Sequence, residues 1–353
     1  MMEALLTGLR QNKKFAVHHL NTQVSRSLAE KGGKHQLRKS IYGAYQVAQL
    51  IRQLITFSPD MVYLTLTNSP SFLGFLRDSP FMLAALLFGK KLAIWFLGGH
   101  YFYAHTTGLK RSFVRVLLSR VSLAVVEGQC LKGVFQELVP RERIRVMPNS
   151  VDDAPFLEAR IRMANKGNSD TLKRILFVGL MCPEKGVRDI IAAIPQVPAA
   201  HFIFVGEWPS AQDEKEVLDF LHQNNVADRV TFTGVVSGPA KFDLFSSSDI
   251  FVFPTYFVYE GHAVSSVEAL AAGLPIICTD HGALNESVRD GWNGFFVPKS
   301  DPAAIARRLN HLLSDDDLRR TMGERSRQLY EERFTLPQYV ENWSKAILRC
   351  AAI

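Results

Sequence analysis

Two glutamates lie eight positions apart in a segment that could bind an anionic ligand. Glu260 stands in a turn with Gly261, and Glu268 stands in a run of small and apolar helix formers that ends at Gly273. A strand, a turn and a helix in this order place the N–H groups of the helix start just beyond the carboxyl end of the strand. Oriented N–H groups and the helix dipole favour an anion there. The segment therefore predicts an anion site suited to a diphosphate.

The two carboxylates have different predicted surroundings. Glu268 is flanked by Val267 and Ala269 on a helix that should be largely buried, and a buried carboxylate needs hydrogen-bond donors. The paired hydroxyls of a ribose would supply them, and a local Arg or backbone donors are the alternative. Glu260 is either a ligand-binding carboxylate or a solvated turn residue.

The C-terminal half alternates short β-branched and aromatic runs with helical patterns, at the pace of βα units. The predicted strands are Arg174–Gly179, His201–Gly206, Val230–Gly234, Asp249–Pro254, Pro275–Asp280 and Gly294–Val297. The predicted helices cover residues 187–197, 211–224, 239–247, 263–273, 283–290, 301–314, 316–333 and 336–351. Continuous apolar strands separated by helices predict a parallel sheet covered on both faces, which is a doubly wound domain.

The N-terminal half repeats this pattern less clearly. Its predicted strands are Phe15–His19, Met61–Thr65, Lys91–Phe96, Leu123–Val126 and Ile144–Met147. Its predicted helices cover residues 38–57, 70–88, 110–119 and 130–138. A doubly wound domain opens with a strand and a glycine-rich turn, whereas residues 3–10 already read as the end of a helix. We expect the first strand to be missing, and the alternative is a fold that begins in an unusual way. The turn-forming residues Pro148–Asp152 predict the domain boundary.

Length and composition exclude several classes of protein. The chain has 353 residues, 47% apolar and 21% charged, which is typical of a soluble protein of roughly two domains. Its longest apolar run, Phe81–Phe88, is too short for a transmembrane helix, and its N-terminus lacks a signal-peptide pattern. Four cysteines, Cys130, Cys182, Cys278 and Cys350, form neither a CxxC pair nor a disulfide framework. We therefore expect a cytoplasmic, reduced protein without a structural metal.

Charge is divided unevenly between the two halves. Residues 1–149 carry 20 Lys and Arg against 7 Asp and Glu, whereas residues 150–353 carry 21 against 27. The net charge of +7 is thus the sum of +13 and −6. A basic half of this kind is expected to face something anionic.

Five motifs, taken in order, resemble the retaining glycosyltransferases of family 4, which have the GT-B fold of two Rossmann-like doubly wound α/β domains facing a central cleft. They are Val146–Asp152, Gly179–Gly186, the Glu-x7-Glu segment Glu260–Pro275, Asp280–Glu286 and Asp290–Val297. Each motif is weak alone, and their shared order is the strong signal. The resemblance implies an acceptor-binding domain over residues 1–149 and a nucleotide-sugar-binding domain over 150–335. It also implies a C-terminal helix over 336–353 that packs back toward the first domain.

The resemblance also implies a role for each matching residue. The residues assigned to the donor are Glu268 for the ribose hydroxyls, Glu260 for hydroxyls of the sugar ring, Lys185 for the diphosphate, and Gly179, Gly234, Gly261, His262, Ala263 and Val264 for backbone contacts. Departure of a nucleoside diphosphate builds negative charge, which a cation and oriented N–H groups stabilise without a metal. No cofactor is therefore expected, and the nucleotide sugar is the donor substrate.

The chain departs from the family pattern at two positions. Leu180 stands where the family has an arginine, and Leu97 stands where it has the histidine of a strand-end HGG segment. Gly98 and Gly99 match that segment on the acceptor side. His100 is the nearest histidine that could take the catalytic place, and the alternative is a histidine packed in a loop among aromatic residues.

In this family the N-terminal domain binds the acceptor, and here that domain interleaves basic and large apolar residues. They are Lys13, Lys14, Lys31, Lys34, Arg38, Lys39, Lys90, Lys91, Lys110, Arg111, Arg115 and Arg120, with Phe72, Phe75, Phe81, Met82 and Phe88. The pattern favours docking on an anionic membrane surface that carries a lipid-linked acceptor; the alternative is ordinary solvated charge around a core. A nucleic-acid partner is not expected, because no RNA- or DNA-binding motif accompanies the charge.

These observations lead to one main hypothesis. It is a metal-independent, retaining glycosyltransferase in the cytoplasm, peripheral on the inner face of the membrane, that acts in cell-surface polysaccharide biosynthesis. It would move a sugar from a UDP- or GDP-linked donor to a glycan or lipid-linked glycan. A non-catalytic subunit that binds nucleotide sugars or glycans is the second hypothesis, motivated by Leu180, Leu97 and the missing first strand. A nucleotide-sugar 2-epimerase of the same fold is disfavoured by the context of the two glutamates.

Overall fold

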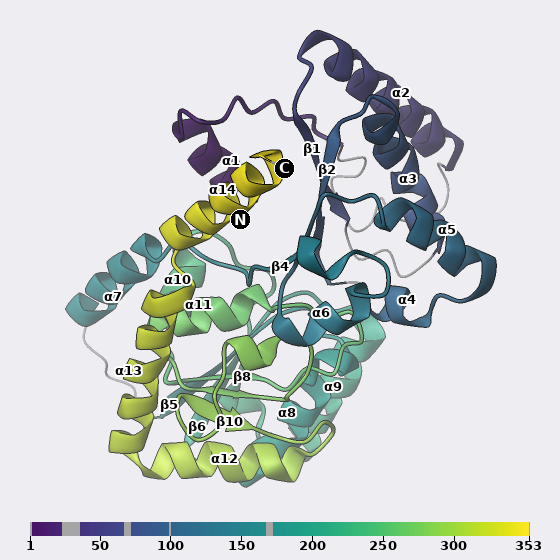
Figure 1. The fold of residues 1–353 in the computed structure, drawn as a ribbon. Helices are drawn as coiled ribbons and strands as arrows, with labels where there is room; N and C mark the ends of the chain where they lie inside the picture. The colour runs from purple at the N-terminus through teal and green to yellow at the C-terminus, as the bar shows by residue number, and fades with distance from the viewer. Residues whose placement is uncertain (1, 23–35, 67–71, 99, 167–171, 353) are drawn as a thin grey trace. The chain divides into compact units, whose positions relative to one another are not determined.

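The chain forms two compact units, which Figure 1 shows as parallel sheets with helices against them. The computed structural model describes residues 2–22, 36–66, 72–98, 100–166 and 172–352, without the side chains of 36–41, 100, 101 and 164–166. The C-terminal unit comprises Pro148–Tyr339, and the N-terminal unit comprises Met2–Met147 together with Val340–Ile353. The chain therefore passes between the units twice, after Met147 and after Tyr339.

The C-terminal unit contains a six-stranded sheet in the order β10-β9-β8-β5-β6-β7, in which all neighbours are parallel. Its strands are β5 (Lys173–Val178), β6 (Ala200–Val205), β7 (Val230–Phe232), β8 (Ile250–Phe253), β9 (Ile276–Cys278) and β10 (Gly294–Phe296). All six strands predicted for this half are confirmed. The chain runs outward from β5 to β7 and then returns to β8 on the other side of β5. The loops after β5 and β8 thus flank the topological switch point, where sheets of this kind bind ligands.

The helices of the C-terminal unit alternate with these strands. They are α7 (Ala154–Lys166), α8 (Val187–Ala193), α9 (Ala211–Gln223), α10 (Pro239–Ser246), α11 (Val264–Ala272), α12 (Pro302–Ser314) and α13 (Asp316–Arg333), with the 3-10 turns η3 (Pro183–Lys185), η4 (Ile194–Gln196), η5 (Ala227–Arg229) and η6 (Leu284–Glu286). The sequence did not predict α7. The predicted helix over residues 283–290 is wrong, since only η6 forms there. The Arg289 N–H donates to Asn293 Oδ1 at 2.8 Å, so a side-chain oxygen replaces a helical carbonyl as acceptor.

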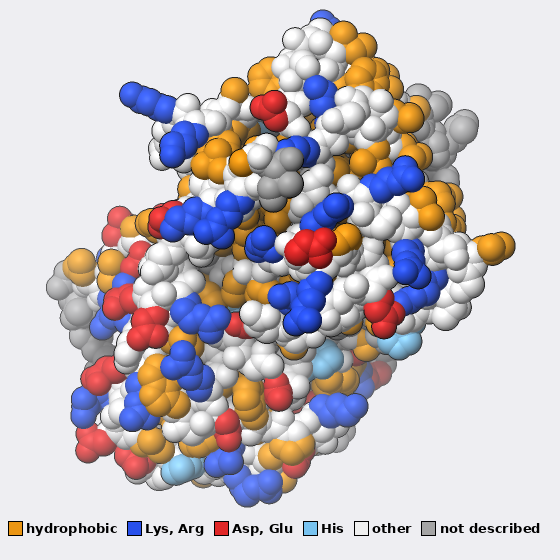
Figure 2. Space-filling model, in the orientation of Figure 1, with side chains coloured by type: hydrophobic (Ala, Val, Ile, Leu, Met, Phe, Trp, Pro, Cys, Tyr) orange, Lys and Arg blue, Asp and Glu red, His pale blue; other side chains and the backbone are white. Residues whose placement is uncertain are grey.

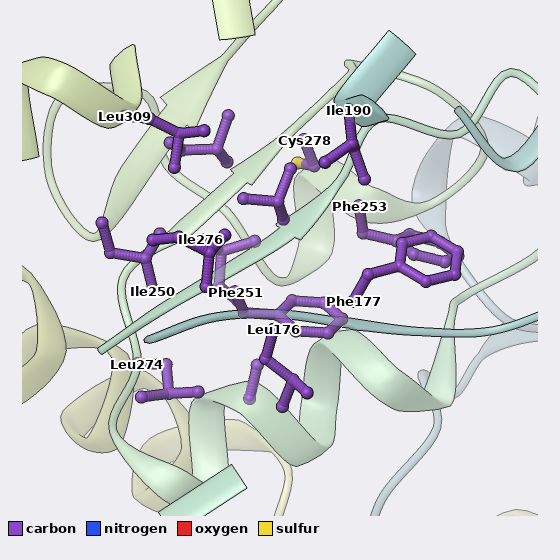
Figure 3. Packing of buried hydrophobic residues seen from close by; sticks show 14 of the residues in the cluster. Leu176, Phe177, Ile190, Ile250, Phe251, Phe253, Leu274, Ile276, Cys278 and Leu309 are labelled. Atoms are coloured by element: carbon purple, nitrogen blue, oxygen red, sulfur yellow. The ribbon is translucent and has the colours of Figure 1, made fainter. Parts of the chain in front are cut away.

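Apolar side chains cover both faces of this sheet, which explains why its strands read as continuous apolar runs. Figure 3 shows the packing around β5 and β8, where Leu176 and Phe177 lie near Phe251 and Phe253. The Phe177 and Phe253 rings stack with centroids 5.7 Å apart. Each of these four side chains is at most 2% exposed. The loops that follow β5 and β8 are therefore mounted on the rigid centre of the unit.

The N-terminal unit contains a four-stranded parallel sheet in the order β1-β2-β3-β4. Its strands are β1 (Met61–Leu66), β2 (Lys91–Phe96), β3 (Leu123–Val126) and β4 (Ile144–Val146). Its helices are α1 (Met2–Gln11), α2 (Gln36–Thr56), α3 (Phe72–Leu87), α4 (His100–His105), α5 (Gly108–Leu118) and α6 (Gln129–Phe135), with the 3-10 turn η2 (Arg141–Arg143) and the larger part of α14 (Leu336–Ala352). Lys91 Nζ donates to the carbonyls of Cys350 and Ala351 at 2.9 and 2.8 Å, which places a cation at the carboxyl end of α14.

The strand predicted over Phe15–His19 is wrong, whereas the other four strands of this half are confirmed. Residues 15–19 form no strand, and none of their side chains is fully buried. An alternating pattern becomes a strand only when a neighbour supplies ladder hydrogen bonds. Within the described residues, β2 is the strand that pairs with β1, and the other edge of β1 has no partner.

Candidate functional site

Two loops meet at the switch point of the C-terminal sheet. One follows β5 and contains η3, and the other follows β8 and leads into α11. The Tyr256 N–H donates to the Glu184 carbonyl at 2.7 Å, which ties the second loop to the first. This arrangement brings Lys185 next to Glu260, although 75 positions separate them in the sequence.

Lys185 and Glu260 form a largely buried ion pair. Lys185 Nζ lies 2.6 Å from Glu260 Oε2, and the two side chains are 15% and 9% exposed. Thr255 Oγ1 donates to the same carboxylate oxygen at 3.0 Å. The ammonium also lies 4.8 Å from the ring centroid of Phe257 and 5.3 Å from that of Phe253. The Lys185 ammonium is thus held by a carboxylate and two aromatic faces, in a place where an anion could replace the carboxylate as its partner.

Gly186 explains why a glycine must follow this lysine. Its φ is +78°, and a Cβ atom there would lie 2.4 Å from the Pro254 carbonyl oxygen. The chain can therefore turn from η3 into α8 while touching the loop after β8 only if this residue has no side chain.

The start of α11 lies in the second loop, directly after Glu260. Ala263 is the N-cap residue, and its methyl group cannot accept a hydrogen bond from the first amides of the helix. The Ala283 N–H donates to the Gly261 carbonyl at 2.9 Å. A Cβ atom on Gly282 would lie 2.8 Å from that same oxygen. The backbone at the helix start is therefore held by residues 282 and 283. Val264, the first helical residue, is 37% exposed.

Glu268 lies within α11 and is 6% exposed. Its Oε1 accepts a hydrogen bond from Lys241 Nζ of α10 at 2.5 Å. Burial raises the pKa of Glu268, and Lys241 opposes this rise. The buried carboxylate thus has a cationic partner, which is a lysine 27 positions away rather than the local arginine or backbone donors of the alternative interpretation. No local pattern in the sequence marks Lys241.

The His262 side chain faces the start of the unit. The Asn149 N–H donates to His262 Nδ1 at 2.9 Å, and His262 Nε2 lies 2.7 Å from Ser287 Oγ. Its ring stacks on Phe334 with centroids 5.5 Å apart. Burial, together with the nearby Arg333, lowers the pKa of His262 to about 3. The ring is therefore neutral, accepting at Nδ1 and donating at Nε2, and it anchors the segment after Met147.

The motif residues beyond α11 also have structural partners. Glu286 Oε2 accepts a hydrogen bond from Arg333 at 2.6 Å, and Asn293 Nδ2 donates to the Ser287 carbonyl at 3.0 Å. A Cβ atom on Gly294 would lie 1.9 Å from the Ile276 carbonyl oxygen. These residues hold β9, β10 and the end of α13 together behind the site.

Gly179 and Gly234 are brought together by a third glycine. The Gly206 N–H donates to the Gly234 carbonyl at 2.9 Å, and a Cβ atom on Gly206 would lie 1.8 Å from the Gly179 carbonyl oxygen. A hollow of about 590 Å³ opens beside them. It is lined by Gly206, Glu207, Trp208, Pro209, Ser210, Ala211, Glu214, Gly234 and Val235.

The predicted acceptor-side residues belong to the N-terminal unit. The Gly98 N–H donates to Glu127 Oε2 at 2.9 Å, and Gly98 has a φ of +60°. Glu127 was not predicted from the sequence. Gly99 and the side chain of His100 lie outside the described part of the chain, so His100 is placed only as the first residue of α4.

Residues 160–329 match the family model described as glycosyl transferases group 1. This part of the chain is therefore similar to a glycosyltransferase group 1 domain. This domain covers the two loops, α10 and α11, and therefore Lys185, Lys241, Glu260 and Glu268.

Known relatives share this domain. An uncharacterized glycosyltransferase of Methanocaldococcus jannaschii is 30% identical over 201 residues, which are 55% of this chain and 50% of that protein. The capsular polysaccharide biosynthesis glycosyltransferase CapM of Staphylococcus aureus is 32% identical over 165 residues, 45% of this chain and 41% of CapM. The chain thus spans about half the length of such relatives.

Solved structures resemble the chain over most of its length. The Anabaena protein HepE, crystallised with UDP, superposes with a TM-score of 0.72 at 17% identity, covering 86% of this chain and 82% of HepE. Sucrose-phosphate synthase from Thermosynechococcus elongatus gives a TM-score of 0.72 at 19% identity, covering 90% of this chain and 80% of that protein. The chain therefore has the GT-B fold of these structures, which consists of two Rossmann-like α/β domains.

Proposed function

We propose that this protein is a retaining glycosyltransferase of family 4 that transfers a sugar from a nucleoside-diphosphate sugar to a glycan or lipid-linked glycan. The observation that carries the proposal is the Lys185–Glu260 ion pair, 2.6 Å long, at the switch point of a glycosyltransferase group 1 domain. The name of CapM, a capsular polysaccharide biosynthesis enzyme, supports a role in cell-surface polysaccharide biosynthesis.

The diphosphate would bind between Lys185 and the start of α11. When it arrives, Lys185 Nζ exchanges Glu260 for a phosphate oxygen, and the N–H groups of residues 261–264 meet the other oxygens. The negative charge that develops on the leaving group is then stabilised by protein groups, and the proposal includes no metal cofactor. Gly179 and Gly234 let the backbone approach the nucleotide closely.

The two glutamates would take separate parts of the donor. Glu260, once released by Lys185, accepts hydrogen bonds from hydroxyls of the sugar ring, and Thr255 keeps its carboxylate oriented. Glu268 accepts hydrogen bonds from the ribose hydroxyls, while Lys241 opposes the rise that burial causes in the pKa of Glu268. UDP in the HepE crystals supports a nucleotide donor, and we propose that this donor is a UDP- or GDP-linked sugar.

The N-terminal unit would present the acceptor. We assign this side to Gly98, Gly99 and His100, with His100 as the catalytic candidate. We place the enzyme in the cytoplasm, peripheral on an anionic membrane surface that displays the lipid-linked acceptor. None of the described helices is long and apolar enough to span a bilayer.

Thermal unfolding with nucleotides tests the donor site. UDP, GDP or one of their sugar conjugates is expected to raise the melting temperature, and Glu268→Gln is expected to remove that rise. Glu332→Gln, at an exposed position of α13, is the control and should keep it. An unchanged melting temperature of the wild type with every nucleotide would contradict the proposal.

One observation favours a second function, a non-catalytic subunit that binds nucleotide sugars or glycans. Leu180, which is 41% exposed, takes the place of an arginine that the family resemblance predicts in the first loop. Loss of one cation weakens the stabilisation of a leaving diphosphate. Nucleotide binding without any sugar transfer or donor hydrolysis would support this function.

A further inference from the structure

We propose that the outer faces of α2, α3 and α5 form one docking surface that binds an anionic lipid bilayer directly. The proposal deepens the proposed function, because it names the surface and the partner that would bring the enzyme to a lipid-linked acceptor. It rests on exposed apolar side chains at helical spacing and on the charge of the same three helices.

Helix α3 is apolar on both of its faces. Its inner face packs Phe75 and Met82 into the core, where they are 2% and 0% exposed. Its outer face carries a stripe spaced by 3, 4, 3 and 4 positions, the repeat of one side of a helix. The stripe consists of Leu73, Leu76, Pro80, Leu83 and Leu87, and its leucines are 73%, 44%, 41% and 83% exposed. A soluble helix normally turns polar residues outward, so this face needs a partner.

The neighbouring helices also expose apolar side chains. Helix α3 contacts both α2 and α5. On α5, Leu109 is 90% exposed and Val116 is 54% exposed; on α2, Tyr45 and Ile55 are 57% and 65% exposed. Figure 2 shows hydrophobic side chains with Lys and Arg side chains among them over this part of the N-terminal unit.

The structure corrects the apolar residues predicted for membrane contact. Phe75, Phe81 and Met82 are buried, and Phe72 is half-buried, so Phe88 is the one predicted apolar residue that is exposed. The sequence pattern marked the inner face of α3, because large apolar side chains occupy both faces of this helix.

The charge of the three helices selects the kind of partner. Residues 36–56, 72–87 and 108–118 contain seven Lys and Arg and one acidic residue, Asp78. Arg77 pairs with Asp78 at 2.7 Å, and Arg111 pairs with Glu137 outside the three helices, so the charge that remains is still positive. Anionic lipid headgroups complement such a surface, since Lys and Arg side chains near the membrane are attracted to them, while exposed leucines enter the acyl boundary. A second copy of this chain would instead set cations against cations.

Vesicle flotation tests the docking surface. The full-length protein is expected to float with vesicles of phosphatidylcholine and phosphatidylglycerol in equal parts, and to bind vesicles of phosphatidylcholine alone weakly. The double variant Leu83→Gln/Leu87→Gln should lower partitioning about tenfold or more, because each change removes buried apolar area from the bilayer. Lys110→Gln/Arg115→Gln should lower binding to the anionic vesicles and leave the weak binding to neutral ones.

A matched control comes from α7 of the other unit. Leu157→Gln/Ile161→Gln changes two exposed apolar residues, 43% and 64% exposed, at the same four-residue spacing. This double substitution should leave flotation of the protein with vesicles unchanged. Equal loss in the control and the α3 variant would overturn the proposal, as would absence of wild-type binding to anionic vesicles. Self-association of the wild type that the α3 variant abolishes would also overturn it, in favour of a second copy as the occupant.

The nucleotide melting shift separates this proposal from the proposed function. The α3 variant should melt as the wild type does without ligand and should keep its shift with the nucleotide that stabilises the wild type. Loss of docking with the shift intact supports the surface assigned here. Wild-type docking without any nucleotide shift would contradict the donor site alone, and a nucleotide shift without docking would contradict the docking surface alone.

Discussion

The two lysine–glutamate pairs of the group 1 domain differ in what a ligand would do to them. In the proposed function, Lys185 changes partner when a diphosphate binds, whereas Lys241 remains the counter-ion of Glu268. The sequence singled out Lys185 because a Lys-Gly pair after a strand has a local signature. Lys241 could not be found in that way, since it meets Glu268 only through the packing of α10 beside α11.

Replacing Lys185 tests the exchange of partners. Lys185→Met is expected to weaken binding of a nucleoside diphosphate about 10- to 100-fold, since a charge-assisted hydrogen bond contributes about 1.5–3 kcal/mol. Binding of the uncharged nucleoside should change little, because the nucleoside carries no phosphate. Calorimetric titration measures both, and equal losses for the two ligands would contradict a diphosphate contact.

Replacing Lys241 tests its role as the counter-ion. Lys241→Met leaves Glu268 buried without its cation, which is expected to lower the free energy of unfolding by about 1–3 kcal/mol at neutral pH. Burial already raises the pKa of Glu268, and the variant raises it further. The deficit should therefore be small at acid pH, where the carboxyl is neutral in both states, and should grow as the pH rises. Urea unfolding of Lys241→Met and Lys241→Arg checks this; a deficit independent of pH would contradict it.

The contribution of His262 to stability increases with pH, whereas that of Glu268 decreases. The pKa of His262 is lowered to about 3 in the folded protein, from an ordinary value near 6.5, so between these values the unfolded chain binds a proton that the folded chain does not. The contribution of His262 to the free energy of unfolding is thus fully present above about pH 6.5. It is lost as the pH falls, by at most about 1.4 kcal/mol per pH unit. In His262→Gln this loss should disappear from urea titrations, whereas His222→Gln, on the exposed side of α9, should keep it.

At the scale of elements, glycines decide how the loops close. Gly186 and Gly234 both have positive φ, at +78° and +70°, but a Cβ atom would strike the Pro254 carbonyl only at Gly186. Gly234→Ala is expected to cost about 1–2 kcal/mol for the left-handed backbone alone. Gly186→Ala should cost more, because the chain must also shift. Denaturant unfolding compares the two, and an equal cost would contradict the role given to Gly186.

Elements that depend on local sequence were predictable, and elements that depend on distant contacts were not. The six C-terminal strands were predictable because strands buried on both faces consist of continuous apolar residues. The helix expected over residues 283–290 failed because Asn293 Oδ1 captures the Arg289 amide, a contact that hydrophobic periodicity does not encode. The exposed stripe of α3 was likewise hidden, because both faces of that helix are apolar.

Across the whole molecule, the net charge of each half is expected to affect a different kind of binding. The half with −6 contains the residues that we propose bind the donor, so the proposed anion binding depends on single cations such as Lys185 and on backbone amides. The half with +13 carries the docking surface, where charge acts collectively. Salt is therefore expected to weaken vesicle binding strongly, because screening acts on exposed charges. Flotation at low and at high salt checks this, and binding that is unaffected by salt would contradict an electrostatic contribution.

The most direct test of the account is release of nucleoside diphosphate from a donor. Phosphorus NMR of the wild type with UDP- and GDP-linked sugars, in the presence of anionic vesicles, should show at least one diphosphate accumulating. The same signal should be absent with Lys185→Met and with Glu268→Gln, and present with the control Glu332→Gln. A wild type that binds a nucleotide sugar yet releases no diphosphate from any donor would contradict the account and support the non-catalytic subunit.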